Sequence, residues 1–361
     1  MQTSSPRRWW PRRWVALVAL TGITAAAAAC SPVAGGPPAS IAPSGNPRPS
    51  SAATASAPVA SASAAPVAPS ASLVLPGTVA AEIAPRLLWK GRDPSGPGTP
   101  SVGQIAFGPD GRIWVSATKL NVFWIFEPSG RFVEAWGTPG DGEGEFDFAR
   151  DGTDSFGAVA FAPDRSLYVA DTGHRRVEHF DASRRFLGAF GEFGSGDGQF
   201  VSPSAIGVGP SGHVFVLDDA RQVVQEFTSD GEFVRAFGGG HGPSMAVSPA
   251  GHILLVDQDR RRLDEYANGI VVRSIDLTGL INFGNGLAVP ADGTIWVASE
   301  IGNGPLPTPD QVLELGTDGR LLHRWPVAAE AIAVDPATDR LYANFFPQPE
   351  LEAYDLPGLA P

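Results

Sequence analysis

Short apolar segments alternate with turns over most of the chain, at the spacing of β-strands. From residue 86 onward, these segments are wholly apolar or alternate apolar with polar positions, and they are rich in aromatic and β-branched side chains. Clusters of proline, aspartate and glycine separate them. None has the 3.6-residue period that an amphipathic helix requires. The pattern therefore predicts an all-β fold.

The strands recur in a unit that appears six times. Each unit opens with an apolar strand that ends in a turn, where proline fixes φ, aspartate bonds to the backbone and glycine admits a positive φ. A second strand follows directly, and a third follows after a short break. The opening strands with their turns occupy residues 104–111, 158–165, 205–212, 245–251, 286–293 and 331–340.

The fourth strand of each unit indicates how the units are arranged. Units one to five continue with a fourth strand, whereas unit six ends in LPGLAP, residues 356–361. RLLWKG, residues 86–91, has the fourth-strand pattern and precedes unit one without a partner. In a closed ring this strand completes the last unit, and the closure leaves only short strand edges. The sequence predicts a six-bladed β-propeller with four-stranded blades over residues 81–361.

The first 30 residues predict export. Four arginines and no acid precede an apolar run from Val15 to Ala29, which is shorter than the roughly 20 residues of a membrane span. Residues 1–29 are therefore predicted to be a signal peptide. Cys30, the only cysteine, follows three alanines and resembles the lipidated cysteine of bacterial lipoproteins. We expect a lipid anchor at Cys30 in the cell envelope, outside the cytoplasm; ordinary cleavage at an A-x-A site is the alternative.

Composition separates a linker from the predicted propeller. Residues 30–80 are rich in proline, alanine and serine and nearly free of charge, so they cannot bury enough surface to fold and are predicted to be a disordered linker. Removal of residues 1–29 changes the formal charge from −12 to −16. An acidic protein repels phosphate backbones and anionic lipids. We therefore expect no nucleic-acid partner, membrane contact through the anchor only, and a monomer.

Unit two resembles the NHL repeat. Its sequence AVAFAPDRSLYVADTGHRRVEHFDASRRFLGAFGEFGSGDGQF matches the NHL order of a P-x-G turn, VYVAD-T-G-N-x-R-V-x-x-F and a glycine-rich loop ending in G-x-F. Units one and three match moderately, units four to six only in outline, and the resemblance covers residues 86–361. It implies a propeller that serves as a binding or scaffold module. RNA binding, known for some NHL domains, is disfavoured by export and by the charge.

An Asp-Thr-Gly tripeptide beginning at Asp171 has the sequence that aspartic proteases use to present a carboxylate. A protease dyad needs two such turns, and the chain has one. Asp218 and Asp257 close the second strand of their units at the same place, where an aspartate accepts backbone N–H bonds. All three are therefore predicted to form turns. The nearby His174 and His179 are assigned to surface or packing positions.

Metal-dependent chemistry is the enzymatic alternative. Amidating lyases that resemble NHL propellers bind a metal through three histidines before the innermost strands, and no histidine occupies those positions here. Lactonase-like propellers instead bind calcium or zinc with acids and asparagines in the central funnel. This second kind of metal site remains an alternative for the chain. The positions that match the lyase histidines are Gly103, Gly157, Ser204, Pro243, Asn285 and Glu330. Hard oxygen ligands for calcium are offered by Asp141, Glu143, Glu145, Asp147 and Glu330. For the first four, solvated acids in an ordinary glycine loop are the favoured interpretation.

Two loops depart from the repeat and suggest a recognition surface. Residues 299–311 extend unit five, and residues 343–350 place two adjacent aromatics where a shorter turn would suffice. Packing over the ring closure is the alternative for these aromatics. The sequence thus predicts a non-catalytic module without a cofactor that binds a protein or small molecule; a hydrolase with calcium or zinc is the alternative. The predicted ligand contacts are Phe345, Phe346, Asn285, Glu330, Glu300 and Asn303.

Overall fold

The computed structural model describes residues 85–92, 102–149, 157–238, 244–300, 310–335, 338, 340–345 and 348–356. The chain divides into two units, Met1–Ala64 and Ala65–Pro361, and every described residue belongs to the second. The predicted signal peptide, Cys30 and the linker up to residue 80 lie outside these ranges. Within the described ranges, no helix has the length and apolar character needed to cross a membrane.

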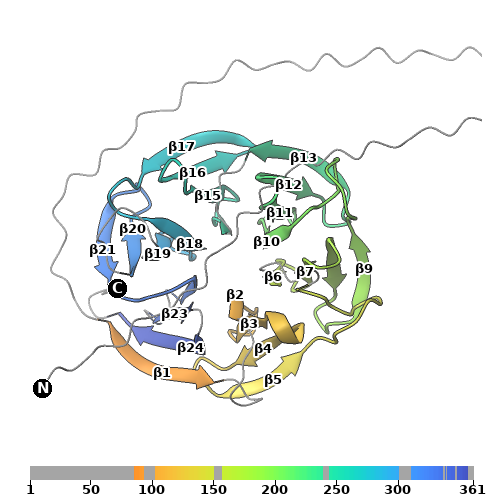
Figure 1. The fold of residues 1–361 in the computed structure, drawn as a ribbon, viewed down its shortest axis with the longest axis horizontal. Coiled ribbons are helices and arrows are strands. Elements are labelled where there is room, and N and C mark those ends of the chain that lie inside the picture. The colour runs from red at the N-terminus through yellow and green to blue at the C-terminus, as the bar shows by residue number, and fades with distance from the viewer. Residues whose placement is uncertain are drawn as a thin grey trace, which may run out of the picture. The chain divides into compact units, whose positions relative to one another are not determined.

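The described strands form six antiparallel sheets of four strands each, placed around a central axis (Figure 1). In five sheets the strand order follows the chain. The fold is a six-bladed β-propeller, as the sequence predicts. The sheets are numbered blades 1 to 6 in chain order.

Blades 1 to 3 follow the chain from Val102 to Gly238. Blade 1 contains β2 (Val102–Phe107), β3 (Ile113–Ala117), β4 (Val122–Phe126) and β5 (Phe132–Trp136), with the 3-10 turn η1 (Thr118–Leu120) after β3. Blade 2 contains β6 (Ala158–Phe161), β7 (Leu167–Asp171), β8 (Arg176–Phe180) and β9 (Phe186–Phe190). Blade 3 contains β10 (Pro203–Val208), β11 (Val214–Asp218), β12 (Val223–Phe227) and β13 (Phe233–Gly238).

Blades 4 to 6 complete the ring. Blade 4 contains β14 (Met245–Val247), β15 (Ile253–Asp257), β16 (Arg262–Ala267) and β17 (Ile270–Asp276). Blade 5 contains β18 (Phe283–Ala288), β19 (Ile295–Glu300), β20 (Gln311–Leu315) and β21 (Leu321–Trp325). Blade 6 contains β22 (Ala331–Asp335), β23 (Arg340–Phe345), β24 (Gln348–Asp355) and the N-terminal β1 (Arg86–Arg92).

The ring closes through β1, as the unpaired segment at 86–91 predicts. This strand pairs antiparallel with β24, from Arg86 opposite Asp355 to Arg92 opposite Glu350. The Arg86 guanidinium donates to the Asp355 carboxylate at 2.6 Å, and Lys90 pairs with Glu352. Strand pairing thus joins segments from the two ends of the propeller.

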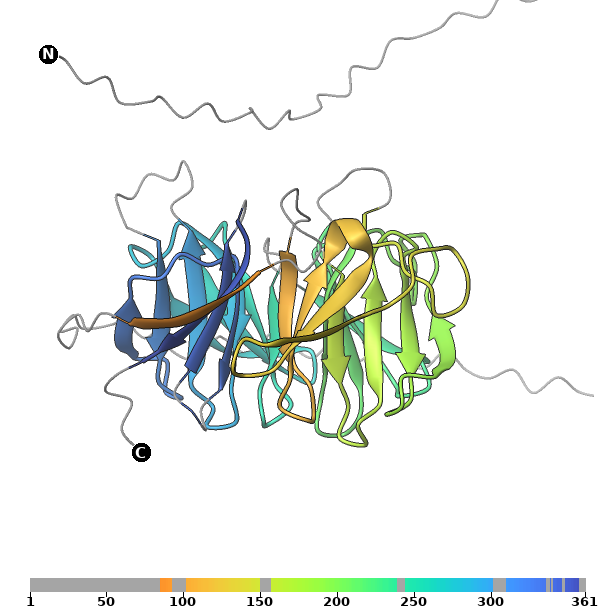
Figure 2. The same cartoon turned by 90° about the horizontal axis from the view of Figure 1, so that it is seen from below.

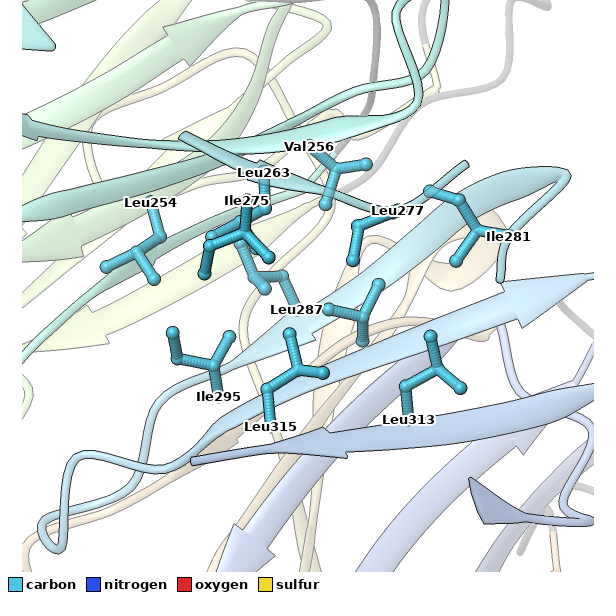
Figure 3. Close-up of a cluster of buried hydrophobic side chains, with 11 residues drawn as sticks. Leu254, Val256, Leu263, Ile275, Leu277, Ile281, Leu287, Ile295, Leu313 and Leu315 are labelled. Carbon is cyan, nitrogen blue, oxygen red and sulfur yellow. The ribbon is translucent and has the colours of Figure 1, made fainter. Parts of the chain in front are cut away.

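The core lies between blades rather than at one centre. In the described part of the chain, the buried apolar side chains form six clusters, one at each interface between neighbouring blades. Because both faces of a blade are covered, its second strand is mostly apolar. Figure 3 shows the cluster between blades 4 and 5: Leu254, Val256, Leu263, Ile275, Leu277, Ile281, Leu287, Ile295, Val297, Leu313 and Leu315.

Three innermost strands begin earlier than the repeat pattern predicts. Strands β2, β10 and β18 start two or three residues before the repeat boundary, and each carries a β-bulge near its start. The extra residue breaks the alternation on which the boundary was placed. The bulges therefore hide the first residues of blades 1, 3 and 5 from the sequence pattern.

Candidate binding face

The antiparallel order of the strands gives the ring two different faces, seen edge-on in Figure 2. One face carries the turns between second and third strands together with the loops that join consecutive blades; we call it the loop face. The opposite face carries the turns between first and second and between third and fourth strands; we call it the turn face. The predicted ligand contacts and metal ligands belong to the loop face.

Polar groups surround the axis where the innermost strands begin. The bulges of β2, β10 and β18 displace Gln104, Ser204 and Asn285 from regular pairing, in alternate blades. Gln104 Nε2 donates to the Ser204 carbonyl at 3.3 Å, across two blades, and Ser244 Oγ donates to the Asn285 carbonyl. Side chains of blades 1 and 4 thus cross to the bulges of blades 3 and 5.

The backbones beside Asn285 and at Glu330, two of the predicted contacts, approach each other between neighbouring blades. A Cβ added at Gly286 would lie 3.1 Å from the Glu330 carbonyl oxygen, so blades 5 and 6 approach closely next to Asn285. The Glu330 N–H donates to the Asn344 carbonyl at 2.8 Å. Both residues are partly exposed, and they belong to neighbouring blades.

The loop that joins blades 1 and 2 is held in place, over its described residues 138–149, by hydrogen bonds and by a buried side chain. Its closing residue Phe146 is fully buried and exchanges backbone hydrogen bonds with Thr138 and Gly140 at 2.8 and 3.2 Å. Arg176 Nη2 donates to the Gly142 and Glu145 carbonyls, both at 2.8 Å. The loop therefore has a fixed shape.

The loop that joins blades 2 and 3, residues 191–202, repeats this construction. Phe200 is fully buried and bonds to the backbone of Glu192 and Gly194 at 2.8 and 3.1 Å. Arg221 Nη1 donates to the Gly196 and Gln199 carbonyls at 3.2 and 2.8 Å. Equivalent residues thus fix both loops.

Two buried aspartates anchor these loops through their backbone. Asp171 Oδ1 accepts the Asp147 N–H at 2.9 Å. The Asp218 carboxylate accepts the N–H groups of Val201 and Ser202 at 2.8 and 3.0 Å. Both side chains are fully buried at the ends of β7 and β11, so each strand end is tied to the loop entering its blade. The recurring aspartates therefore act as backbone acceptors.

Asp257 closes β15 in a different way. Its Oδ1 accepts the Arg260 N–H at 3.0 Å, and its Oδ2 pairs with the Arg260 guanidinium at 2.7 Å. The Arg261 N–H donates to the Gln258 carbonyl in the same turn. This is the local turn geometry that the repeat predicts for an aspartate at a strand end.

The turn at residues 172–175 connects the two loops. His174 is nearly buried; its Nδ1 lies 2.6 Å from Asp171 Oδ2 and its Nε2 lies 2.8 Å from Asp141 Oδ1 in the first loop. The Arg175 guanidinium lies over the ring of Phe193 in the second loop, 5.0 Å from its centroid. Loops 138–149 and 191–202 and this turn therefore form one surface, which we call the loop platform.

A buried carboxyl supports the loop platform. Glu178 in β8 is fully buried, and Arg176 Nη2 lies 2.5 Å from its Oε1. Burial raises the pKa of Glu178 to about 8 and outweighs the opposing charge of Arg176. Burial also raises the pKa of Asp171, against the hydrogen bonds from Asp147 and His174. In blade 3, Gln225 replaces Glu178 and accepts the Gly198 N–H at 2.9 Å.

The acids predicted to bind a metal do not form a cluster. Among the described residues, no three acid, histidine or cysteine side chains are arranged to hold an ion. Asp141 contacts His174, whereas Asp147 Oδ1 accepts the Ala149 N–H at 3.2 Å. Glu145 caps the Gly142 N–H at 2.9 Å, and Gln199 does the same for Gly196. Glu143 is exposed, and Glu330 precedes β22 of blade 6, away from the loop that holds the other four acids.

The remaining predicted contacts are only partly described. Phe345 ends β23 and pairs with Gln348, so the long loop expected at 343–350 is mostly strand. Glu300 ends β19 opposite Phe283. The side chains of Phe345 and Glu300 lie outside the described part of the structure, as do Phe346 and Asn303 entirely.

Two features of the loop platform are absent from the predicted sites. These are Phe193, which is 68% exposed, and the contacts of His174 with Asp171 and Asp141. A comparison of the two loops offered a signal, because Phe146 and Phe200 recur whereas Pro139 occupies the place of Phe193. His213, His252 and His323 lie at the turn face, each with Nδ1 on a third-strand glutamate, at 2.6 to 2.9 Å. These positions agree with the sequence-based prediction that the three histidines do not converge on the axis.

Comparisons with known proteins support the architecture. No known family profile matches the chain. An 82-residue segment is 35% identical to "Protein brain tumor" of Drosophila melanogaster; it covers 22% of this chain and 8% of that protein.

Solved structures cover more of the chain. XC5397 of Xanthomonas campestris, described as a gluconolactonase, has a TM-score of 0.53 and 16% identity, over 79% of this chain and 99% of its own. A structure described as a putative gluconolactonase has a TM-score of 0.51 and 17% identity, over 77% and 93%. The Cps50 (Swd1) propeller domain of Myceliophteria thermophila has a TM-score of 0.52 and 9% identity, over 75% of this chain and 99% of its own.

What these structures share with the chain is the fold. At such identities the likeness extends to the arrangement of blades and not to the residues of a site. The set includes an enzyme and a domain described only as a propeller, so the architecture alone does not select a function.

Proposed function

We propose that the protein is a non-catalytic binding module that is anchored in the cell envelope through Cys30 and takes a ligand on its loop face. The observation that carries this proposal is the loop platform. Its two loops are fixed by buried Phe146 and Phe200 and by the carboxylates of Asp171 and Asp218. A surface that is fixed in advance loses little conformational entropy on binding. Segment 30–80 would hold this surface away from the membrane.

The loop face also supplies contact groups around the axis. Asn285 and Glu330 come from neighbouring blades, and the predicted contacts Phe345, Phe346, Glu300 and Asn303 belong to blades 5 and 6. We include them in the proposed surface because they share this face with the loop platform. A ligand that spans the axis would contact both groups.

The test is crosslinking of the anchored protein in its own envelope. We expect Phe193→Ala to reduce the yield of the main crosslinked species at least about fivefold, since truncation of an exposed aromatic anchor commonly costs more than 1 kcal/mol. Leu187→Ala is the matched control, because Leu187 is 49% exposed on β9 outside the loop platform. Cys30→Ala should remove the protein from the membrane fraction. Equal crosslinking by wild type and Phe193→Ala would count against the loop platform.

A metal-dependent hydrolase is the second candidate, and the approach of Asn285 and Glu330 favours it. These residues offer one amide and one carboxylate oxygen donor near the axis. A calcium site takes six to eight oxygen ligands, and the described residues add no acid cluster there. Calcium or zinc retained by the dialysed full chain, and lost in Glu330→Gln, would decide for this candidate.

A further inference from the structure

The most exposed large apolar side chain among the described residues lies on the loop platform. Phe193 is 68% exposed, and the other large apolar side chains of that part of the chain are 55% exposed or less. Most of those others belong to the outermost strands. Phe193 instead lies between Glu192 and Gly194, and the backbones of both bond to Phe200. Its position is therefore fixed, although its side chain is open to solvent.

The ring of Phe193 is also held by Arg175, which is itself fixed by hydrogen bonds. The Arg175 guanidinium lies 5.0 Å from the ring centroid, and Arg175 Nη1 donates to the Gly173 carbonyl at 2.9 Å. The Gly173 N–H in turn donates to the Asp147 carbonyl at 2.7 Å. An aromatic ring that is exposed and already held in place is the usual anchor of a protein interface.

The charges around this ring have one predominant sign. Asp141 is 79% exposed in the first loop, and Glu143, Glu192 and Asp197 are also exposed. The arginines of the loop platform are turned inward: Arg176 and Arg221 donate to loop carbonyls, and Arg175 lies against Phe193. The exposed side chains of the loop platform therefore combine one aromatic ring with several carboxylates.

We infer that the loop platform binds a basic peptide segment that carries an apolar side chain, presented by a partner protein. The apolar side chain would pack on Phe193, and lysine or arginine side chains would pair with the surrounding carboxylates. The net negative charge of the chain would also speed the approach of such a partner. This inference rests on the proposed function and names the ligand class.

The experiment uses three synthetic octapeptides and the full-length protein in detergent. The first peptide alternates lysine with leucine and phenylalanine, the second replaces each lysine by glutamate, and the third keeps the lysines and replaces the apolar residues by serine. Fluorescence anisotropy gives each Kd at low and at physiological salt. We expect the first peptide to bind at least about tenfold more tightly than either of the others, and to weaken as salt rises.

Variants separate the apolar and the charged contributions. Phe193→Ala should weaken the first peptide about tenfold. Glu143→Gln with Asp197→Asn should weaken it severalfold and flatten the salt dependence. The matched control is Asp230→Asn with Glu232→Gln, which removes two exposed acids at the turn face of blade 3 and should change nothing.

The outcomes distinguish this inference from the proposed function. The inference would be overturned if the acidic peptide bound as tightly as the first peptide or more tightly. It would also be overturned if Phe193→Ala left the Kd of the first peptide unchanged. If no peptide binds while envelope crosslinking still depends on Phe193, the ligand belongs to another class and the binding function stands. If crosslinking is also indifferent to Phe193, both fail.

Discussion

Single residues of this propeller are interpretable because the blades repeat. Glu178 and Gln225 occupy the same place in β8 and β12, and Gln225 Oε1 accepts the Gly198 N–H of the loop that enters its blade. Gln225 Nε2 also donates to the Gln199 carbonyl at 2.8 Å, which in addition accepts Arg221. Blade 3 therefore shows how a neutral amide fits the site that a buried carboxyl fills in blade 2.

The pKa of Glu178 predicts a pH dependence of stability. Burial raises this pKa from 4.5 to about 8, so between these values the folded protein holds a proton that the unfolded chain has released. Stability contributed by Glu178 is complete below about pH 4.5 and is lost as the pH rises toward 8. Glu178→Gln should remove this loss, and its advantage in Tm should grow by roughly 8 °C from pH 4.5 to 8.5.

Thermal unfolding of both proteins over this pH range provides the measurement. The difference between the two curves isolates Glu178, since Asp171 and the other buried acids are common to both. Gln225→Glu in blade 3 is the reciprocal variant and should introduce a similar pH dependence. Parallel curves for wild type and Glu178→Gln would show that Glu178 stays charged in the folded protein.

At the scale of elements, the blade-joining loops resemble short structural units more than flexible connections. Each is held by a buried phenylalanine of its own, Phe146 or Phe200, and by an arginine and an aspartate from the neighbouring strands and turns. Asp-Gly and Gly-rich sequence is usually associated with mobility, but here positive φ at Gly144 and Gly198 allows the tight turn that these contacts hold. Loop shape therefore depends on packing below the loop.

Removal of a loop anchor should destabilise the protein, and removal of its exposed aromatic should not. Phe200→Ala deletes a fully buried side chain and should cost about 3–5 kcal/mol of unfolding free energy. Phe193→Ala on the same loop should change stability by less than about 0.5 kcal/mol. Urea unfolding of the two variants gives the comparison. Similar losses in both would mean that Phe193 supports the loop as well.

The outermost strands show a second regularity. In blades 1 to 5, each carries a β-bulge one or two residues after its start, at Val133, Leu187, Val234, Val272 and Leu322. A bulge interrupts the hydrogen-bonding edge that another chain would need for pairing. The side chains of Leu187, Val234, Val272 and Leu322 are exposed on edges that the bulges make less suited to sheet extension.

At the scale of the whole ring, stability depends on closure. Each blade contributes to two of the six interblade clusters, and β1 supplies the outer strand of blade 6. Without β1, the edge of β24 would be open along its length, from Glu350 to Asp355. Ring closure therefore links the stability of the last blade to a strand more than 250 residues away.

Deletion of residues 1–92 should lower the Tm and promote self-association through β24. The matched control deletes residues 1–80, which keeps β1 and should retain the Tm of the full chain. Thermal unfolding and light scattering after size-exclusion chromatography measure both effects. An unchanged Tm and a monomeric 93–361 fragment would show that β1 does not contribute to closure.

The sequence by itself determined the number of blades, the four strands of each and the closure by residues 86–91. These features follow from local alternation, turn residues and the unpaired strands at the two ends, all of which are visible along the chain. It also placed Asp171, Asp218 and Asp257 at strand ends, because the repeat aligns them. Strand starts were shifted only where bulges interrupt the alternation.

The tertiary structure alone decided which loop residues meet. The contacts of Gln104 with Ser204, of Asp141 with His174 and of Arg175 with Phe193 join separate blades or loops, and each depends on the rotation between blades. Phe193 and Phe200 also look alike in sequence, yet one is exposed and the other is buried. Local patterns encode strands, whereas the surface arises from packing between units, and no period along the chain records it.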